Sequence, residues 1–172
     1  MSEKSLLRRL KSLAKGLMYF VALPPPASVI AFWRVRCAAP SKEKGSIVEV
    51  PFCRDRRYVI ALRAQTTDLA IFEQIFVLRD CDVSLRAAPH LIVDCGAHVG
   101  CSARYFASRF PDATIVAVEA ERSNFDMLVR NVRDGSGIVP IHAAVWGDKE
   151  ARLAIMNPDE SSWGFRVGEV TD

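Results

Sequence analysis

The chain has 172 residues, of which half are hydrophobic and a quarter are charged. This length and composition suit one globular domain with a hydrophobic core of useful size. The formal net charge of +3 is too small to indicate a nucleic-acid-binding protein, and no basic stripe with interleaved aromatic residues is present.

The cysteines indicate neither a disulfide framework nor a zinc site, because their number, five, is odd and no C-x-x-C pair occurs. Cys81, Cys95 and Cys101 lie among apolar residues, where a free cysteine acts as a small hydrophobe. A reducing, cytoplasmic location is the simplest fit. The three histidines show no metal-ligand spacing, so no metal site is expected.

Residues 1–45 are predicted to form a helical lead-in to a domain over residues 46–172. An amphipathic helix over residues 1–23 would end at the prolines 24–26, which supply no N–H group. Its apolar stretch is short for a membrane span, which needs roughly 20 residues. The helix would pack on the domain or on a partner, and its basic side chains would also allow weak contact with a membrane surface.

The next segment is predicted to hold an antiparallel hairpin and a helix. The strands are expected around residues 47–50 and 58–63, joined by a turn at residues 53–56. Apolar residues then recur at helical spacing over residues 69–78, after Thr66-Thr67-Asp68, whose side chains can cap a helix.

From residue 91 onwards, strands and helices alternate. The branched run Leu91-Ile92-Val93 reads as a strand buried on both faces, as in a parallel sheet covered by helices. Ser123 is expected to cap the second of the two helices, with Asp126 completing a capping box. The predicted elements are strands 91–93, 115–118, 138–145 and 152–156 and helices 101–110 and 123–132. This order predicts an α/β parallel sheet.

The turn after the first of these strands has the form D-x-G-x-x-x-G, from Asp94 to Gly100. Ligands of open α/β sheets bind beyond the carboxyl ends of the strands. Gly96 would let a ligand approach the backbone, and N–H groups at the start of the helix could hold an anion. Glu119 ends the next strand, where an acid can accept hydrogen bonds from both hydroxyls of a ribose. The pattern therefore indicates a nucleoside-bearing ligand.

The spacing of the turn favours one cofactor class over another. A dinucleotide fingerprint, G-x-G-x-x-G, has a second glycine where this chain has His98, whose side chain a pyrophosphate would meet. The turn instead resembles motif I of S-adenosylmethionine-dependent methyltransferases. An NAD-dependent oxidoreductase is a less favoured alternative.

The resemblance extends to one family of these transferases. The run VDCGAHVGCSARYFASRFPDATIVAVEAERSNFDMLVRN resembles the FkbM methyltransferases, which typically read I-D-x-G-A-N-x-G and then V-x-A-(F/V)-E-P. IHAAVWGDKEARLAIMNP resembles the family's third strand and the hairpin beyond it, and LRAQTTDLAIFEQIFVLRDCD its lead-in. The likeness covers roughly residues 58–167, with the core motifs in residues 89–146.

This resemblance implies the first half of a Rossmann-like, class I methyltransferase sheet that binds S-adenosyl-L-methionine. Glu119 would hold the ribose, and two alanines at the end of the third strand would flank the adenine. His98 stands where the family has Asn, and Ala120 replaces the usual Pro. The residues implied for the methionine side are Asp94, Gly96, Ala97, His98 and Gly100, and those for the adenine are Ala143 and Ala144.

The family continues into a K-I-D-x-E-G motif near the methyl-transfer centre, and this chain ends at Asp172 without it. The expectation is a fragment or a truncated product. The implied reaction is O-methylation of a small-molecule or glycan hydroxyl, with no residue assigned as its base. The alternative is a non-catalytic remnant that binds only cofactor or partners, with self-association through an unpaired sheet edge.

Overall fold

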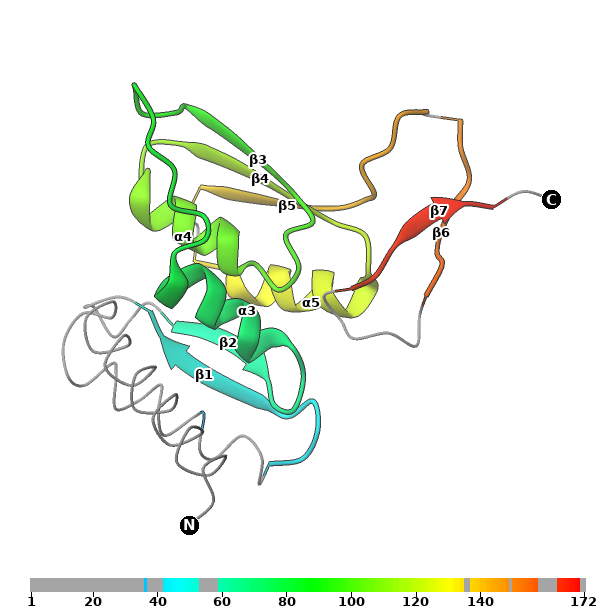
Figure 1. Ribbon diagram of the computed structural model, residues 1–172, viewed down its shortest axis with the longest axis horizontal. Coiled ribbons are helices and arrows are strands. Elements are labelled where there is room, and N and C mark those ends of the chain that lie inside the picture. Colours follow the sequence, from blue (N-terminus) through cyan, green and yellow to red (C-terminus); the bar gives the residue numbers. More distant parts are fainter. Residues whose placement is uncertain are drawn as a thin grey trace, which may run out of the picture.

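The computed structural model describes residues 36, 42–52, 59–134, 137–148, 150–157 and 164–170. These residues form three layers, with a layer of helices between a parallel sheet and an N-terminal hairpin, and a second hairpin projects from the end of the sheet (Figure 1). The lead-in helix predicted over residues 1–23 and the turn predicted at residues 53–56 lie outside the described residues.

The parallel sheet has three strands in the order β3-β4-β5, each hydrogen-bonded in parallel to its neighbour. The predicted α/β, Rossmann-like alternation is therefore confirmed, although the third strand ends at His142 and residues 143–146 are irregular. The elements are β3 (Leu91–Cys95), α4 (Cys101–Arg109), β4 (Thr114–Glu119), α5 (Arg122–Asn131) and β5 (Ile138–His142).

The two helices cover one face of this sheet. Ile115 and Ala117 of β4 are fully buried in a cluster with Leu128 of α5. On the opposite face, Leu91 and Val93 are 58% and 55% exposed. The prediction that β3 is buried on both faces is therefore wrong within the described residues, since no described element packs on the second face. A branched apolar run identifies a strand, but it does not reveal what covers the strand.

A second unit precedes the sheet. The strands β1 (Ile47–Pro51) and β2 (Val59–Arg63) pair antiparallel, which confirms the predicted hairpin. The predicted helix over residues 69–78 is also present, but only α3 (Asp68–Phe72) is α-helical. The segment η2 (Glu73–Leu78) continues it as a π-helix, which apolar spacing does not distinguish from an α-helix.

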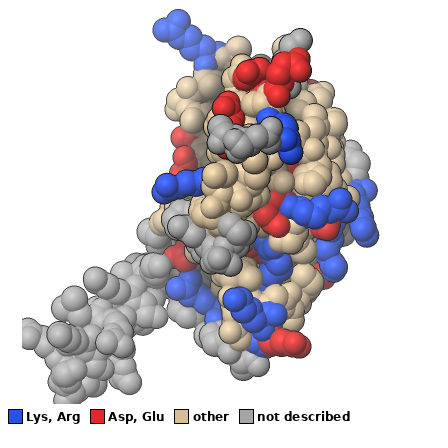
Figure 2. Space-filling model, turned by 90° about the vertical axis from the view of Figure 1, so that its right-hand side faces the viewer, with Lys and Arg blue, Asp and Glu red and all other residues tan. Residues whose placement is uncertain are grey.

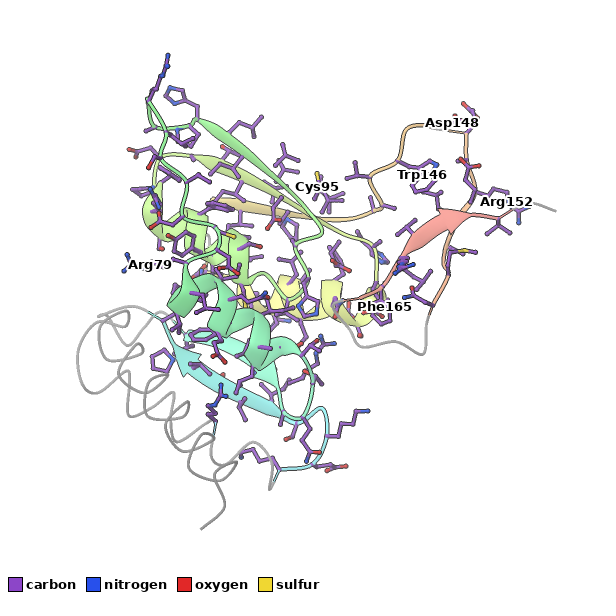
Figure 3. All side chains as sticks on the ribbon, viewed as in Figure 1. Arg79, Cys95, Trp146, Asp148, Arg152 and Phe165 are labelled. Carbon is purple, nitrogen blue, oxygen red and sulfur yellow. The ribbon has the colours of Figure 1, made fainter. Side chains whose placement is uncertain are left out.

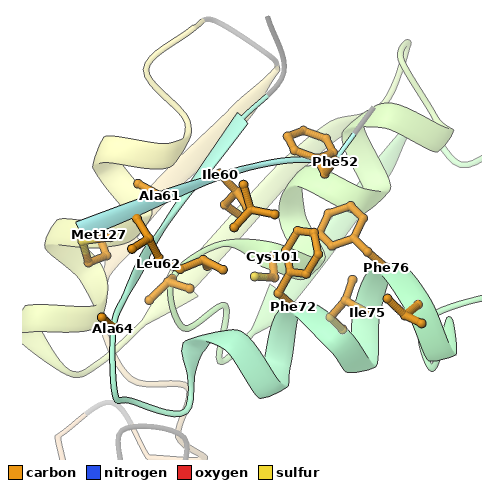
Figure 4. Packing of buried hydrophobic residues seen from close by; sticks show 14 residues of the cluster. Phe52, Ile60, Ala61, Leu62, Ala64, Phe72, Ile75, Phe76, Cys101 and Met127 are labelled. Carbon is orange, nitrogen blue, oxygen red and sulfur yellow. The ribbon is translucent and has the colours of Figure 1, made fainter. Parts of the chain in front are cut away.

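The N-terminal unit packs on the two helices through an apolar core (Figure 4). Ile60, Leu62 and Phe72 are fully buried in it, together with Cys101 of α4 and Met127 of α5. Full burial of such an aliphatic or aromatic side chain contributes about 1.5–3 kcal/mol. The core therefore joins the N-terminal unit firmly to the helices that flank the glycine turn.

The helix α5 begins differently from the prediction. Its N-cap is Glu121, whose carboxylate accepts hydrogen bonds from the backbone N–H groups of Ser123 and Asn124. The predicted cap at Ser123 is wrong, since the Ser123 hydroxyl donates to Glu121 instead. Although burial acts to raise it, the pKa of Glu121 is lowered, because these donors stabilise its charged form.

The last described elements form a hairpin, β6 (Leu153–Ile155) with β7 (Val167–Glu169). Trp146 joins it to the segment after β5, because its Nε1 donates to the Glu169 carboxylate over 2.8 Å. Figure 2 shows the face of the molecule at this end, where acidic and basic side chains are interspersed on an otherwise uncharged surface. Among the described residues, no helix combines the length and apolarity needed to cross a membrane.

Asn131 makes a buried polar link between the two units. Its Oδ1 accepts from the Ala61 N–H over 2.8 Å, and its Nδ2 donates to the carbonyls of Ala61 (3.0 Å) and Val99 (2.8 Å). Asn131 thus satisfies the outward backbone groups of β2, as a further strand would.

We expect Asn131→Leu to lower the free energy of unfolding by about 1–3 kcal/mol, because the buried backbone groups of Ala61 lose their partners. Urea denaturation followed by circular dichroism measures this. The control is Asp126→Ala on the exposed side of the same helix, which should stay within about 0.5 kcal/mol of wild type. Equal stability of the two variants would contradict the role of Asn131.

Candidate functional site

The glycine turn folds back over the end of β4. The N–H groups of Gly96 and Ala97 both donate to the Val118 carbonyl, each over 2.9 Å. Gly96 has a φ of +103°, a left-handed conformation that favours glycine, and a Cβ built on it would meet nothing within 4 Å. The turn therefore presents bare backbone to open space at the carboxyl end of the sheet.

Gly100 ends the glycine turn at the start of α4. It is the N-cap residue of α4, with a φ of +89°. A Cβ at this position would lie 2.8 Å from Cδ1 of Leu128 in α5. The left-handed φ favours glycine at this position, and Gly100 is not among the residues that line the cavity described below.

Glu119 lies at the carboxyl end of β4 and is 8% exposed. Its Oε2 accepts the N–H of His98 over 2.9 Å, and its Oε1 accepts the N–H of Glu121 over 2.9 Å. The side-chain amide of Asn124 lies 3.5 Å from Oε1. A carboxylate has about four acceptor positions, so these bonds orient Glu119 and leave capacity for a ligand hydroxyl.

The Asp94 side chain makes a hydrogen bond within the fold. Its carboxylate accepts a 2.6 Å hydrogen bond from the Ser102 hydroxyl in the first turn of α4. Burial raises the pKa of this carboxyl, while the bond from Ser102 opposes the shift. The structure thus places Asp94 where it holds the start of α4 against the sheet.

The ring of His98 lies beside α3. Its Nε2 lies 3.8 Å from Oδ1 of Asp68 in α3, and neither ring nitrogen has a hydrogen-bond partner within the described part of the chain. His98 has a φ of +51°, which is uncommon for a residue other than glycine. Its backbone N–H, and not its ring, contributes to the site through Glu119.

A cavity of about 200 Å³ lies between the ends of the parallel strands and the β6–β7 hairpin. Four of the eight site residues predicted from the sequence line this cavity: Gly96, Glu119, Ala143 and Ala144. The other four are not among its lining residues: Asp94, Ala97, His98 and Gly100. Cys95, Val118, Ala120 and Val145 complete the sheet side. The cavity therefore has one charged side chain, Glu119, within an otherwise mostly apolar wall.

The hairpin supplies the part of the wall that sequence reasoning missed. Ile155, Phe165 and Val167 line the cavity opposite the sheet ends. Figure 3 places Cys95 at the end of β3 and Phe165 just before β7. The alternation of Phe165 with Val167 is the local signal that the sequence offers, and it does not reveal which surface the two side chains meet.

No protein-family model matches the chain, and no curated protein matches it. Among solved structures, the chain is similar to a methyltransferase from Geobacter sulfurreducens, with 22% sequence identity and a TM-score of 0.31. The likeness covers 44% of this chain and 48% of that protein, so it spans about half of the solved structure. The Rossmann-like class rests on the β3-β4-β5 sheet and its crossover helices.

The buried His98 ring makes stability depend on pH. Burial lowers its pKa and Arg63 adds to this, whereas Asp68, Glu119 and Glu121 act in the opposite direction. The unfolded chain therefore takes up this proton first, near the ordinary histidine pKa of about 6.5. The stability that the neutral ring contributes is present above that pH and is lost as the pH falls below it.

We expect the free energy of unfolding of the wild type to fall more between pH 7.5 and pH 5.0 than that of His98→Asn. Asparagine tolerates the left-handed backbone and does not titrate. Urea denaturation at both pH values measures the difference, in which the contributions of the other groups largely cancel. An equal or larger loss in the variant would show that His98 does not titrate with a lowered pKa.

Proposed function

We propose that this chain binds S-adenosyl-L-methionine and is the cofactor-binding part of a methyltransferase of the FkbM type. The observation that carries the proposal is the oriented carboxylate of Glu119, which lies in the wall of the cavity beside the bare backbone of Gly96. Rossmann-like sheets hold a ribose through an acid at the end of the second parallel strand, next to a glycine turn, which accepts hydrogen bonds from the ribose hydroxyls.

The two ends of the cavity suit the two ends of a nucleoside. Glu119 would accept hydrogen bonds from the ribose hydroxyls at the polar end. The adenine would lie between the segment 143–145 and the apolar hairpin wall. The backbone N–H groups of Ala144 and Val145 form no hydrogen bond within the described residues, so they are available to ring nitrogens of a base.

The methionine end would extend from the nucleoside along the glycine turn. A cavity of about 200 Å³ is smaller than the roughly 300–1,000 Å³ of typical small-molecule sites, so it suits part of the cofactor. The N–H groups of Gly96, Ala97 and His98 are already bonded within the fold. The cofactor's carboxylate would therefore use the N–H groups in the first turn of α4, where the helix dipole favours an anion.

The acceptor would be a hydroxyl of a small molecule or glycan, as the family resemblance implies. Methyl transfer from sulfonium to oxygen depends chiefly on alignment of the nucleophile, the methyl group and the sulfur. No described residue is assigned as a base. Cofactor binding is therefore the part of the function that this chain can be tested for directly.

We expect Glu119→Gln to weaken binding of S-adenosylhomocysteine about 10- to 100-fold. A hydrogen bond to a charged group contributes about 1.5–3 kcal/mol, and each 1.4 kcal/mol is tenfold in affinity. Isothermal titration calorimetry measures the dissociation constants, and circular dichroism confirms folding. The control is Asp112→Asn, an exposed acid before the opposite end of β4, which should bind as wild type does.

The same titration separates the candidate ligands. Wild-type chain that binds NAD more tightly than S-adenosylhomocysteine would favour the oxidoreductase alternative. Folded wild-type chain that binds neither ligand at millimolar concentration would leave only the non-catalytic interaction module.

We expect Phe165→Ala to weaken S-adenosylhomocysteine binding about 5- to 100-fold, because stacking of a base on an aromatic ring contributes about 1–3 kcal/mol. Calorimetry again measures the change. Val170→Ala is the matched control, since Val170 follows the same strand but is exposed and does not line the cavity. Wild-type affinity in the Phe165 variant would place the base elsewhere.

A further inference from the structure

A buried ion pair lies behind the candidate ribose site. Asp68 of α3 is fully buried, and its two carboxylate oxygens accept hydrogen bonds from Nε and Nη2 of Arg63, each over 2.9 Å. The backbone N–H of Arg63 donates to the same carboxylate over 2.9 Å. Both residues belong to the N-terminal unit, outside the parallel sheet.

Arg63 reaches from this pair into the start of α5. Its Nη2 donates to Oδ1 of Asn124 over 2.6 Å, and its Nη1 donates to the Ser123 hydroxyl over 3.0 Å. Because a guanidinium can only donate, Arg63 fixes which way the Asn124 amide points. The Nδ2 group of Asn124 is thereby directed to Oε1 of Glu119, at 3.5 Å.

The other oxygen of Glu119 is bonded to a residue whose ring lies beside the same pair. The Oδ1 atom of Asp68 lies 3.8 Å from Nε2 of His98, whose backbone N–H donates to Oε2 of Glu119 over 2.9 Å. At 3.8 Å the contact between the His98 ring and Asp68 is longer than a hydrogen bond, so the bonded link from the buried pair to Glu119 runs through Asn124.

Stability alone is a weak explanation for this pair. Burying two charges costs desolvation energy, and well-packed apolar residues often replace a buried ion pair without loss of stability. Arginine instead offers fixed, planar directionality, because its fork of donors sets several partners at once. The Arg63 fork bonds Asp68 in the N-terminal unit and Asn124 in α5 at the same time.

We infer that Arg63 and Asp68 are positioning residues for the ribose-binding carboxylate, so that the N-terminal unit sets how strictly the site recognises a ribose. This inference rests on the proposed function of Glu119. It extends the site beyond the glycine turn and the strand ends to the N-terminal unit. Asn124 transmits the effect, because its side chain contacts both Arg63 and Glu119.

The test compares affinity for S-adenosylhomocysteine with affinity for its analogue with a 2′-deoxyribose. The wild type should prefer the full ribose about tenfold or more, because a hydrogen bond to the charged Glu119 is lost in the analogue. Arg63→Lys keeps the charge but loses the fork, and we expect the preference to fall below about threefold. Asn124→Ala, which leaves the buried pair intact, should lower the preference in the same way.

The control is Asp134→Asn, which weakens a second arginine–aspartate pair, one between a buried arginine and an exposed aspartate that lies away from the candidate cavity. Arg104 is 4% exposed, and its Nη1 lies 2.6 Å from both oxygens of Asp134. This variant should keep the wild-type ribose preference, even if its melting temperature falls. The readout is the ratio of two dissociation constants, which a general loss of stability does not change.

The outcomes separate the inference from the function on which it rests. If the folded variants Arg63→Lys and Asn124→Ala both keep the ribose preference of the wild type, the positioning role is overturned and the proposed function stays intact. Wild-type chain that binds neither ligand would overturn both. Loss of preference in the two variants but not in Asp134→Asn would support the inference.

Discussion

The carboxylate of Glu119 is the point at which three parts of the chain meet. The N–H of His98 in the glycine turn and the N–H of Glu121 before α5 both donate to it over 2.9 Å. These bonds fix the turn, the strand end and the helix start relative to one another. Glu119 therefore supports the local structure as well as being the candidate ligand group, and its orientation is set before any ligand arrives.

Much of the fold was predictable, because the periodicity of apolar residues changes between strands and helices and the breaks are marked by glycine and proline. The order of strands and helices from residue 91 follows from these signals. The cap of α5 was not predictable from the serine alone, since Glu121 two residues earlier competes for the same N–H groups. The burial of the second face of β3 depends on tertiary packing, which a run of branched residues such as Leu91–Val93 does not predict.

The candidate site was partly predictable for a geometric reason. The carboxyl ends of parallel strands meet at one edge of a sheet, so Gly96, Glu119 and Ala143 were expected together and line one cavity. The roles of Arg63 and Phe165 depend on long-range contacts. Arg63 lies 61 positions from Asn124, and no spacing rule links the two residues. The sequence thus indicated which residues meet at the sheet edge, while the surrounding wall and its supports required the structure.

The most direct measurement of the central claim is a nuclear magnetic resonance titration of the ¹⁵N-labelled chain with S-adenosylhomocysteine. We expect the amide resonances of His98 and Glu121, which bond to the Glu119 carboxylate, to shift together with that of Ala144 along one saturation curve. The amide of Thr114, at the opposite end of β4, should stay unchanged. Saturable shifts that leave His98 and Glu121 unaffected, or no shifts at millimolar ligand, would contradict the assignment of Glu119 as the ribose-binding group.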